Sequence, residues 1–159
     1  MPDILHRVGL DAPAQRVYQA LTTIDGLRAW WVEETSGEPR VGGTINFGFC
    51  DMQVIESVPD RLVHWRCVRG PQEWLSTEVT FELTQSDGSL AAGARDVRYG
   101  KTKDGQTFVV FKHSGWKEPV EFMHHCSTKW ATFLLSLRDL LEGSGGHPYP
   151  HDIKIHVGD

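Results

Sequence analysis

Residues 130–142, WATFLLSLRDLLE, decide the fold of this chain. They extend an apolar stripe with three- and four-residue spacing, which predicts one long helix that starts near residues 118–122 and stops at Gly143. The stripe consists of Phe122, Cys126, Trp130, Phe133, Leu134, Leu137 and Leu141. Because the residues between 43 and 113 predict short strands, this helix has only a sheet on which to bury its stripe.

The N-terminal residues predict a strand followed by two short helices. Residues 4–10 form the predicted strand, and Asp11 with Pro13 then indicates a helix start, through a side-chain cap and a residue of fixed φ. One face of this first helix carries Val17, Ala20, Leu21 and Ile24. Asp25 and Gly26 are expected to end it and to introduce a second helix. That second helix carries Leu27, Trp30 and Trp31.

Alternating apolar and polar residues predict the first strands of the sheet. Residues 44–49 alternate in this way, with one aromatic face. Residues 52–58 and 61–69 are separated by the turn signal Pro59-Asp60, so they predict an antiparallel hairpin. Alternation groups Val63, Trp65, Cys67 and Arg69 on one side of the second of these strands. The apolar members of the group indicate that this side faces inward.

Two further strands are predicted at residues 73–84 and 107–113. The residues between them, 86–105, are rich in Gly, Ser, Asp and Lys. They predict either a long loop or a loop with an extra strand near residues 95–99, and we favour the extra strand. Residues 103–105 then predict a hairpin turn into the last strand.

Composition and charge exclude several classes of function. The chain has 159 residues, a formal net charge of −5 and a pI near 5.9, without the basic cluster that binds nucleic-acid phosphates. No apolar run approaches the roughly 20 residues of a membrane-spanning helix, and the N-terminus lacks a signal-peptide core. Cys50, Cys67 and Cys126 are widely separated, which is typical of reduced thiols. We therefore expect a cytoplasmic protein.

The length predicts a single domain over residues 1–142, followed by a tail, residues 143–159. The tail contains turn signals and then the alternation of Ile153, Ile155 and Val157. This pattern fits a terminal strand, a partner-binding arm or a frayed end. As a strand, it could pair with the sheet edge of a second copy in a homodimer.

Short stretches with a characteristic order extend over nearly the whole chain. They are Ala12-Pro13, Trp30-Trp31, VGG at 41–43, VPDRLVHW at 58–65, TEVTFEL at 77–83, HSGW at 113–116 and residues 130–141. In this order they resemble the START-like (SRPBCC) superfamily, and within it a stand-alone bacterial member of the activator of heat shock protein 90 ATPase homologue group. The resemblance implies an α+β helix-grip fold: a curved antiparallel sheet of six or seven strands around the C-terminal helix, with a ligand cavity between them. Residues 86–105 exceed the connection usual in this group.

Large side chains expected to border that cavity are the candidate site residues. They are Trp30, Trp31, Phe47, Trp65, Arg69, Phe81, Phe111, Trp116, Trp130, Phe133, Leu134 and Leu137. Aromatic rings can line an apolar pocket and offer an indole N–H to a ligand, or they can simply fill the core. Arg69 could reach the cavity mouth and hold an anionic head group, or remain solvated or ion-paired. Trp74, beside a turn, is expected at the surface or the rim.

Histidines are frequent enough for a metal site to be considered. His124 and His125 are adjacent on the predicted helix and diverge by about 100°, so a regular helix cannot turn both toward one ion. His147, His151 and His156 have ligand-like spacing, but no cysteine pair or HExxH pattern accompanies them. The sequence therefore predicts no metal and no cofactor.

Catalytic signals are also weak. No hydrolase or nucleotide-binding motif is present in the sequence. His64, Glu33 or Glu121 could supply a general acid or base near a pocket, but nothing in the sequence selects one of them. His113, at the end of the last strand, is a further polar candidate.

The leading hypothesis is a non-enzymatic protein that binds a small hydrophobic molecule between the sheet and the C-terminal helix. Two alternatives follow from the resemblance. One is a chaperone-associated factor related to the heat shock protein 90 ATPase activators, and the other is an enzyme of the polyketide cyclase or dehydratase type. Both rest on analogy at the level of the fold.

Overall fold

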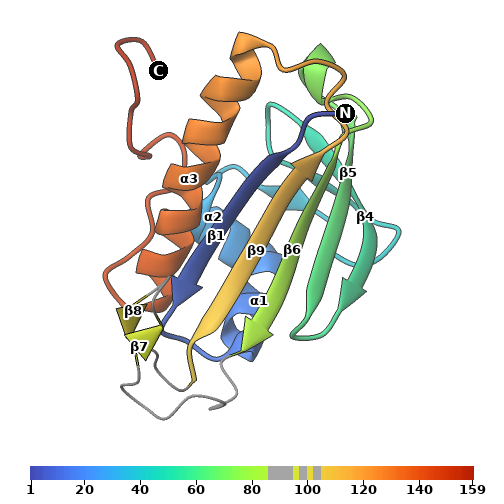
Figure 1. Cartoon of the computed structure of the whole chain (residues 1–159). Helices are drawn as coiled ribbons and strands as arrows, with labels where there is room; N and C mark the ends of the chain where they lie inside the picture. The colour runs from blue at the N-terminus through green and yellow to red at the C-terminus, as the bar shows by residue number, and fades with distance from the viewer. Residues whose placement is uncertain (86–94, 97–99, 102–104) are drawn as a thin grey trace.

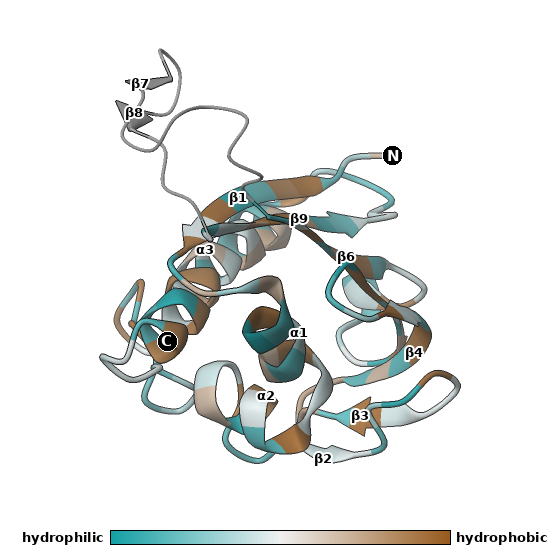
Figure 2. Ribbon diagram, turned by 90° about the horizontal axis from the view of Figure 1, so that it is seen from below, coloured by the Kyte–Doolittle hydropathy of each residue, from teal (hydrophilic) through white to brown (hydrophobic). Residues whose placement is uncertain are grey.

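The computed structural model describes residues 1–85, 95–96, 100–101 and 105–159. It has an α+β helix-grip fold, in which a curved antiparallel sheet packs against a long C-terminal helix, as predicted (Figure 1). The α-helices in this described part are α1 (Ala14–Thr22), α2 (Ile24–Trp30) and α3 (Glu121–Leu141). Seen along the barrel-like curve of the sheet, α1 and α2 lie within the curve and α3 runs beside it (Figure 2).

The main sheet has seven strands, and the first strand of the chain pairs with the last. In spatial order they are β1 (Ile4–Leu10), β9 (Thr107–Ser114), β6 (Glu78–Gln85), β5 (Leu62–Arg69), β4 (Asp51–Val58), β3 (Thr44–Asn46) and β2 (Ser36–Gly37). Every neighbouring pair is antiparallel, so one face can be buried while the other meets water.

A separate pair of two-residue strands, β7 (Arg95–Asp96) and β8 (Gly100–Lys101), lies in the long segment before β9. The extra strand predicted at residues 95–99 overlaps β7. Residues 97–99, and residues 103 and 104 of the predicted hairpin turn, lie outside the described part of the chain.

The predicted hairpin of residues 52–58 and 61–69 is confirmed as β4 and β5. Asp60 adopts a φ of 63° at the turn, which Asp tolerates better than most residues, and Val58 then pairs with Leu62. Val63, Trp65 and Cys67 are buried, so the predicted inner face of β5 is also confirmed.

Two predicted strands are shorter in the structure. The strand of residues 44–49 ends at Asn46, because the Asn46 side chain accepts a hydrogen bond from the Gly48 backbone N–H and donates one to Asp51, which turns the chain. Phe47 remains buried after this turn, whereas Phe49 is 47% exposed.

The strand of residues 73–84 begins only at Glu78. A 3-10 turn, η1 (Gln72–Trp74), occupies its predicted start, and Ser76 has a φ of 68°, which a strand cannot accommodate. The hydroxyl of Thr77 donates a hydrogen bond of 2.5 Å to the carbonyl of Trp74, which fixes this turn. The turn directs Trp74 inward.

The helix boundaries follow the prediction in α3 and differ in detail in the short helices. Helix α3 begins at Glu121, and Gly143, with a φ of 92°, follows its end. Pro13 occupies the position before α1 without a side-chain cap, so the cap predicted at Asp11 is wrong. Thr23 separates α1 from α2 and accepts the Gly26 N–H at 3.0 Å, which places Asp25 and Gly26 inside the second helix.

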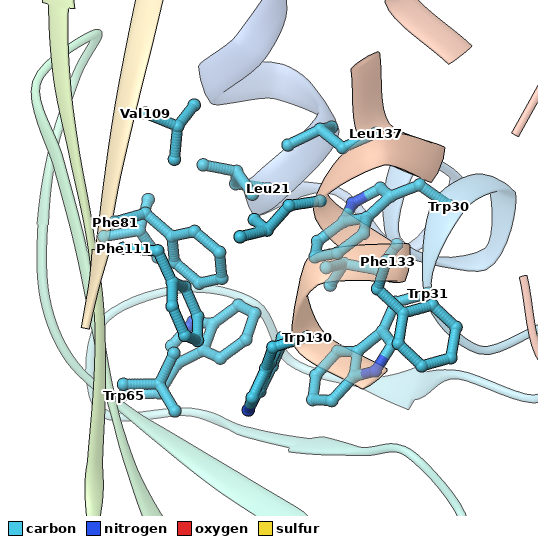
Figure 3. Packing of buried hydrophobic residues seen from close by; sticks show 14 of the residues in the cluster. Leu21, Trp30, Trp31, Trp65, Phe81, Val109, Phe111, Trp130, Phe133 and Leu137 are labelled. Carbon is cyan, nitrogen blue, oxygen red and sulfur yellow. The ribbon is translucent and has the colours of Figure 1, made fainter. Parts of the chain in front are cut away.

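The space between the sheet and α3 is filled by interlocking aromatic rings (Figure 3). Trp65 meets Phe81 at a centroid distance of 5.1 Å, Phe81 meets Phe111 at 5.3 Å, and Phe111 meets Trp130 of α3 at 4.5 Å. Trp30 of α2 closes this core, and its indole N–H donates to the Ala20 carbonyl at 2.9 Å. Edge-to-face and tilted pairs of this kind combine large apolar burial with favourable ring geometry.

The residues after α3 fold back along the helix toward α2. The Tyr149 backbone N–H donates to the Trp31 carbonyl at 2.7 Å, and the Glu33 N–H donates to the Tyr149 carbonyl at 3.0 Å. Residues 153–157 have a bend at 155–156 and a turn that begins at 157, not the terminal strand suggested as one alternative, and Ile153 and Val157 are exposed. None of the helices within the described residues has the length and hydropathy needed to cross a membrane.

Candidate ligand-binding pocket

A pocket of about 430 Å³ opens beside the N-terminal half of α3. Its walls come from five parts of the chain: the residues after α2, the turn at 47–49, the turn at 71–74, one face of α3, and the C-terminal tail. The lining residues are Trp31, Val32, Glu34, Phe47, Gly48, Phe49, Pro71, Trp74, Phe122, His125, Cys126, Lys129, Trp130, Phe133, Tyr149, Asp152 and Asp159. No residue of the described strands is among them, so the pocket lies at one end of the helix and not under the sheet.

Aromatic rings form most of the pocket wall. Trp31 lies between Phe47, at a centroid distance of 4.2 Å, and Trp130, at 4.8 Å. Trp74 faces Trp130 at 6.1 Å with the two planes only 13° apart. Phe49 touches the edge of Trp74 at 5.4 Å and is half exposed, so it forms the rim. The result is a largely apolar surface that is partly open to solvent.

One end of the pocket is polar and is built around Lys129. Its ammonium group forms ion pairs with Asp152 and, at 2.8 Å, with Asp159, and its side chain is only 13% exposed. Asp152 has a second partner, Lys154, at 2.7 Å. These pairs join the tail to α3 and neutralise the charges at this end.

The protonation states of this cluster follow from those pairs. Burial would raise the pKa of Asp152 and of Asp159, but hydrogen bonds from Lys129 and its positive charge outweigh burial and leave both pKa values below the usual range. For Lys129, burial would lower the pKa, and the two carboxylates raise it above its ordinary value instead. All three groups are therefore charged at neutral pH.

A buried network behind the pocket holds two of its tryptophans. The Trp130 indole N–H donates to Nδ1 of His113 at 3.2 Å, and the other ring nitrogen of His113 lies 2.8 Å from the Thr77 hydroxyl. Because that hydroxyl donates to the Trp74 carbonyl, Nε2 of His113 must carry the proton and donate to Thr77. Burial lowers the pKa of His113 to about 3, so the imidazole is neutral in the folded protein.

Cys126 contributes a thiol to the pocket wall. Its Sγ accepts a hydrogen bond from the Trp74 indole N–H at 3.4 Å, and burial raises the pKa of the thiol to about 11. The thiol therefore stays protonated at neutral pH and acts as a small apolar group and not as a nucleophile.

The structure separates the sequence-predicted site residues into two groups. Trp31, Phe47, Trp130 and Phe133 line the pocket. Trp30, Trp65, Phe81, Phe111, Leu134 and Leu137 are buried in the core and do not line it. Trp116 is also buried outside the pocket, packed on His113 at a centroid distance of 5.1 Å, and its indole nitrogen has no hydrogen-bond partner among the described residues.

Arg69 requires a correction, because it lies outside the pocket. Its guanidinium donates to Asp51 at 2.8 Å and to the Gly48 carbonyl at 3.0 Å. Of the two roles considered for Arg69, the ion-paired side chain is therefore the one observed. The hydrogen bond between Arg69 and Asp51 is the largest cause of the lowered pKa of Asp51 and of the raised pKa of Arg69. Arg69 thus supports the turn that carries Phe47 and Phe49.

The remaining polar candidates also lie elsewhere. His64 is bonded to Glu78 at 2.7 Å on the sheet, and Glu33 pairs with His151 at 3.2 Å. Neither these residues nor Glu121 line the pocket, so none of them is placed to act as an acid or a base there.

Sequence reasoning missed Trp74, Phe49, Lys129 and the tail residues of the pocket. Trp74 was expected at the surface or at the rim. The surface position is wrong, since Trp74 is only 4% exposed. Its position depends on the 3-10 turn at Gln72–Trp74, for which the Pro71 that precedes it was the available signal. No local pattern links the tail to Lys129.

The fold and this pocket define a class: START-like (SRPBCC) helix-grip domains with a cavity next to the C-terminal helix. Residues 11–94 match the family model described as "Activator of Hsp90 ATPase homolog 1-like protein". The chain belongs to this family, as the sequence resemblance predicted.

Similar solved structures agree with this assignment. The solution structure of the Aha1 dimer from Colwellia psychrerythraea is 41% identical, covers 91% of this chain and 98% of its own, and superposes with a TM-score of 0.72. CalU16 from Micromonospora echinospora is 20% identical over 89% of this chain and 75% of its own, with a TM-score of 0.69, and therefore shows the fold alone. No curated protein is similar enough to count as a match.

Proposed function

We propose that this protein binds a small hydrophobic molecule in the pocket beside α3. The observation that carries the proposal is the aromatic wall around about 430 Å³ of space, in which Trp31, Trp74 and Trp130 converge from three separate segments. Pockets that hold small molecules typically measure about 300–1,000 Å³ and are mainly apolar. A ligand that covers these rings would remove their exposed apolar surface from water, which is favourable.

The charges at the polar end favour a neutral ligand. Lys129 already pairs with Asp152 and Asp159, so a carboxylate or phosphate on the ligand would have to displace one of these partners. An ammonium group would meet the same difficulty at the two aspartates. Exchanging one buried ion pair for another brings little net affinity, whereas apolar contact with the rings is gained in full.

Fluorescence titration with N-phenyl-1-naphthylamine, a neutral aromatic probe, tests the proposal. We expect saturable binding with one probe per chain, weakened at least severalfold by Phe49→Ala and by Phe122→Ala, because both rings line the pocket. The matched control is Phe108→Ala, which removes the same ring from the outer face of the sheet, where Phe108 lies under Arg7 at 3.8 Å. Absence of saturable binding, or equal weakening in all three variants, would contradict the proposal.

Assembly as a homodimer is a second proposal, about the state of the protein and not about its ligand. It is supported by the relative from Colwellia psychrerythraea, which was solved as a dimer at 41% identity. Light scattering of the full chain after gel filtration should give twice the mass of 17.9 kDa. A version that ends at Gly143 would show whether the tail contributes, and a monomer at high micromolar concentration would end this proposal.

The chaperone-associated and the cyclase or dehydratase hypotheses remain distinct from ligand binding. The first is supported by the family description and is tested by the effect of the protein on the ATPase rate of a bacterial heat shock protein 90 chaperone. The second needs a polar group placed on the substrate, and the pocket offers Lys129, His125 and Glu34 for this. A turnover that survives substitution of all three would exclude these groups as its catalysts.

A further inference from the structure

The tail brings two potential metal ligands to the side of α3, where a third one lies. His156 and Asp159 belong to the tail, and His125 belongs to the helix. One ligand atom from each of these three residues lies within 4.8 Å of the other two. The sequence separates His125 from the other two by some thirty positions, so no spacing pattern could reveal the group.

Each of the three side chains is oriented by a neighbour. Nδ1 of His156 lies 2.8 Å from the Val157 carbonyl, and because a carbonyl can only accept, this nitrogen carries the proton. The lone pair is therefore on Nε2, the state in which a histidine binds a metal while its other nitrogen donates to a carbonyl. A turn closed by the Asp159 N–H on the His156 carbonyl, at 3.2 Å, holds these two residues together.

His125 and Asp159 are held in a comparable way. The His125 ring stacks on Phe122 at a centroid distance of 5.9 Å with an interplanar angle of 11°, and it faces the His156 ring at 5.5 Å. Oδ2 of Asp159 accepts hydrogen bonds from Lys129 at 2.8 Å and from the Ile155 N–H at 2.9 Å. Both bonds are made by Oδ2, and they hold the carboxylate in place.

We propose that His125, His156 and Asp159 bind a divalent transition-metal ion, with Zn²⁺ as the first candidate. Two imidazoles and one carboxylate suit zinc and its neighbours, whereas Mg²⁺ and Ca²⁺ prefer oxygen ligands alone. Zn²⁺ binds such ligands at about 2.0–2.1 Å, which places tetrahedral donors about 3.3 Å apart. The three ligand atoms lie within 4.8 Å of one another, so side-chain movements of about an ångström would bring them to that spacing.

The ion would connect the tail to α3 next to the pocket. His125 and Asp159 both line the pocket, so the coordination position left open by three protein ligands lies near its mouth. The positive charge of Lys129, which pairs with Asp159, would repel a cation, but Asp152 also pairs with Lys129 and offsets that charge. The proposal does not depend on the hydrophobic ligand, since the ion needs only the helix and the tail.

Calorimetric titration of ZnCl₂ into tag-free, chelator-treated full-length protein tests the site. We expect one Zn²⁺ per chain, no binding of Mg²⁺, and a loss of affinity of at least about tenfold in His125→Ala and in His156→Ala. His124→Ala is the matched control, because this exposed neighbour points about 100° away around the helix and should bind Zn²⁺ like the original protein.

Hydrogen exchange of the tail provides a second readout that separates a metal site from a change in folding. If opening of the tail breaks the site, Zn²⁺ at 100 times its dissociation constant slows exchange in residues 149–159 by roughly 100-fold. The effect should vanish in His156→Ala while its exchange without metal stays unchanged. Equal zinc affinity in His124→Ala and His156→Ala, or zinc binding without protection of the tail, would overturn the proposal.

Discussion

Helix α3 borders two aromatic regions that differ in how completely they fill space. On the sheet side, Phe81 packs on Phe111 at a centroid distance of 5.3 Å, Phe111 packs on Trp130 at 4.5 Å, and all three rings are buried (Figure 3). On the tail side, Phe49, Trp74 and Phe133 surround a pocket of about 430 Å³. Trp130 belongs to both regions.

The difference arises from the elements that supply the side chains. Neighbouring strands are held about 4.8 Å apart, so their inward residues repeat regularly and can interdigitate with a helix. Apart from α3, the pocket walls come from two turns, the residues after α2 and the tail, which share no repeat. Aromatic content alone therefore does not distinguish a packed core from a binding site.

The largest expected effect comes from truncating the packed region. Phe81→Ala removes a fully buried ring and should lower the free energy of unfolding by about 4 kcal/mol. The same change at the pocket rim, Phe49→Ala, should cost less than about 1 kcal/mol, because that ring is 47% exposed in the folded protein. Urea denaturation measures both, and similar losses would show that the pocket region is part of the cooperative core.

The stability of the protein should depend on pH through His113, which belongs to the buried network behind Trp130. Burial lowers the pKa of His113 to about 3, against an unfolded value near 6.5, so the unfolded chain binds the extra proton between these limits. This contribution is complete above pH 6.5 and is lost as the pH falls toward 3. Each pH unit below 6.5 then lowers the free energy of unfolding by about 1.4 kcal/mol, which amounts to about 2 kcal/mol at pH 5.

Denaturation at pH 7 and pH 5 measures this loss. In His113→Gln, which keeps a donor and an acceptor without a titrating group, the pH 7 to pH 5 difference should largely disappear. An unchanged difference in that variant would assign the slope to the exposed histidines.

The tail should respond to charge removal and not to mild acid. Lys129→Met leaves Asp152 buried with one partner fewer and should weaken tail attachment by about 1–2 kcal/mol. Lys154→Met removes the more exposed partner of the same carboxylate and should cost less than about 0.5 kcal/mol. Hydrogen exchange in residues 149–159 reports both, and the reverse order would show that Lys154 holds the tail.

Because hydrogen bonds and charge from Lys129 keep the pKa values of Asp152 and Asp159 below 3.8, the same exchange rates should stay constant from pH 7 down to about pH 4 after correction for intrinsic exchange. The carboxylates stabilise the attachment above that pH and lose this contribution only as the pH falls through their lowered values. Release of the tail at pH 5 would contradict the assigned ion pairs.

The smallest effect is expected at Arg69. Its side chain lies outside the pocket and acts only through the turn that carries Phe47 and Phe49, so Arg69→Ala should weaken the affinity for N-phenyl-1-naphthylamine less than Phe49→Ala does. Fluorescence titration checks this. A large loss would mean that the turn carrying Phe47 and Phe49 depends on the Arg69 bond to the Gly48 carbonyl.

Much of the fold could be predicted because its signals are local. The stripe of α3, the β4 and β5 hairpin and the inward side of β5 all follow from spacing along one segment. The errors occur where a side chain competes with the strand pattern: Asn46 ends β3 by bonding Gly48, and Thr77 fixes a turn where a strand was predicted. Those bonds place Phe49 and Trp74 at the pocket.

By itself the sequence determined the class of this protein, a helix-grip domain, because hydrophobic periodicity specifies which face of each element is buried. Tertiary structure decided where space remained. The predicted cavity beneath the sheet is occupied by Trp65, Phe81 and Phe111, and the pocket lies instead where the tail meets Lys129. Packing density and contacts between distant segments depend on the whole fold, so no local pattern could encode the site.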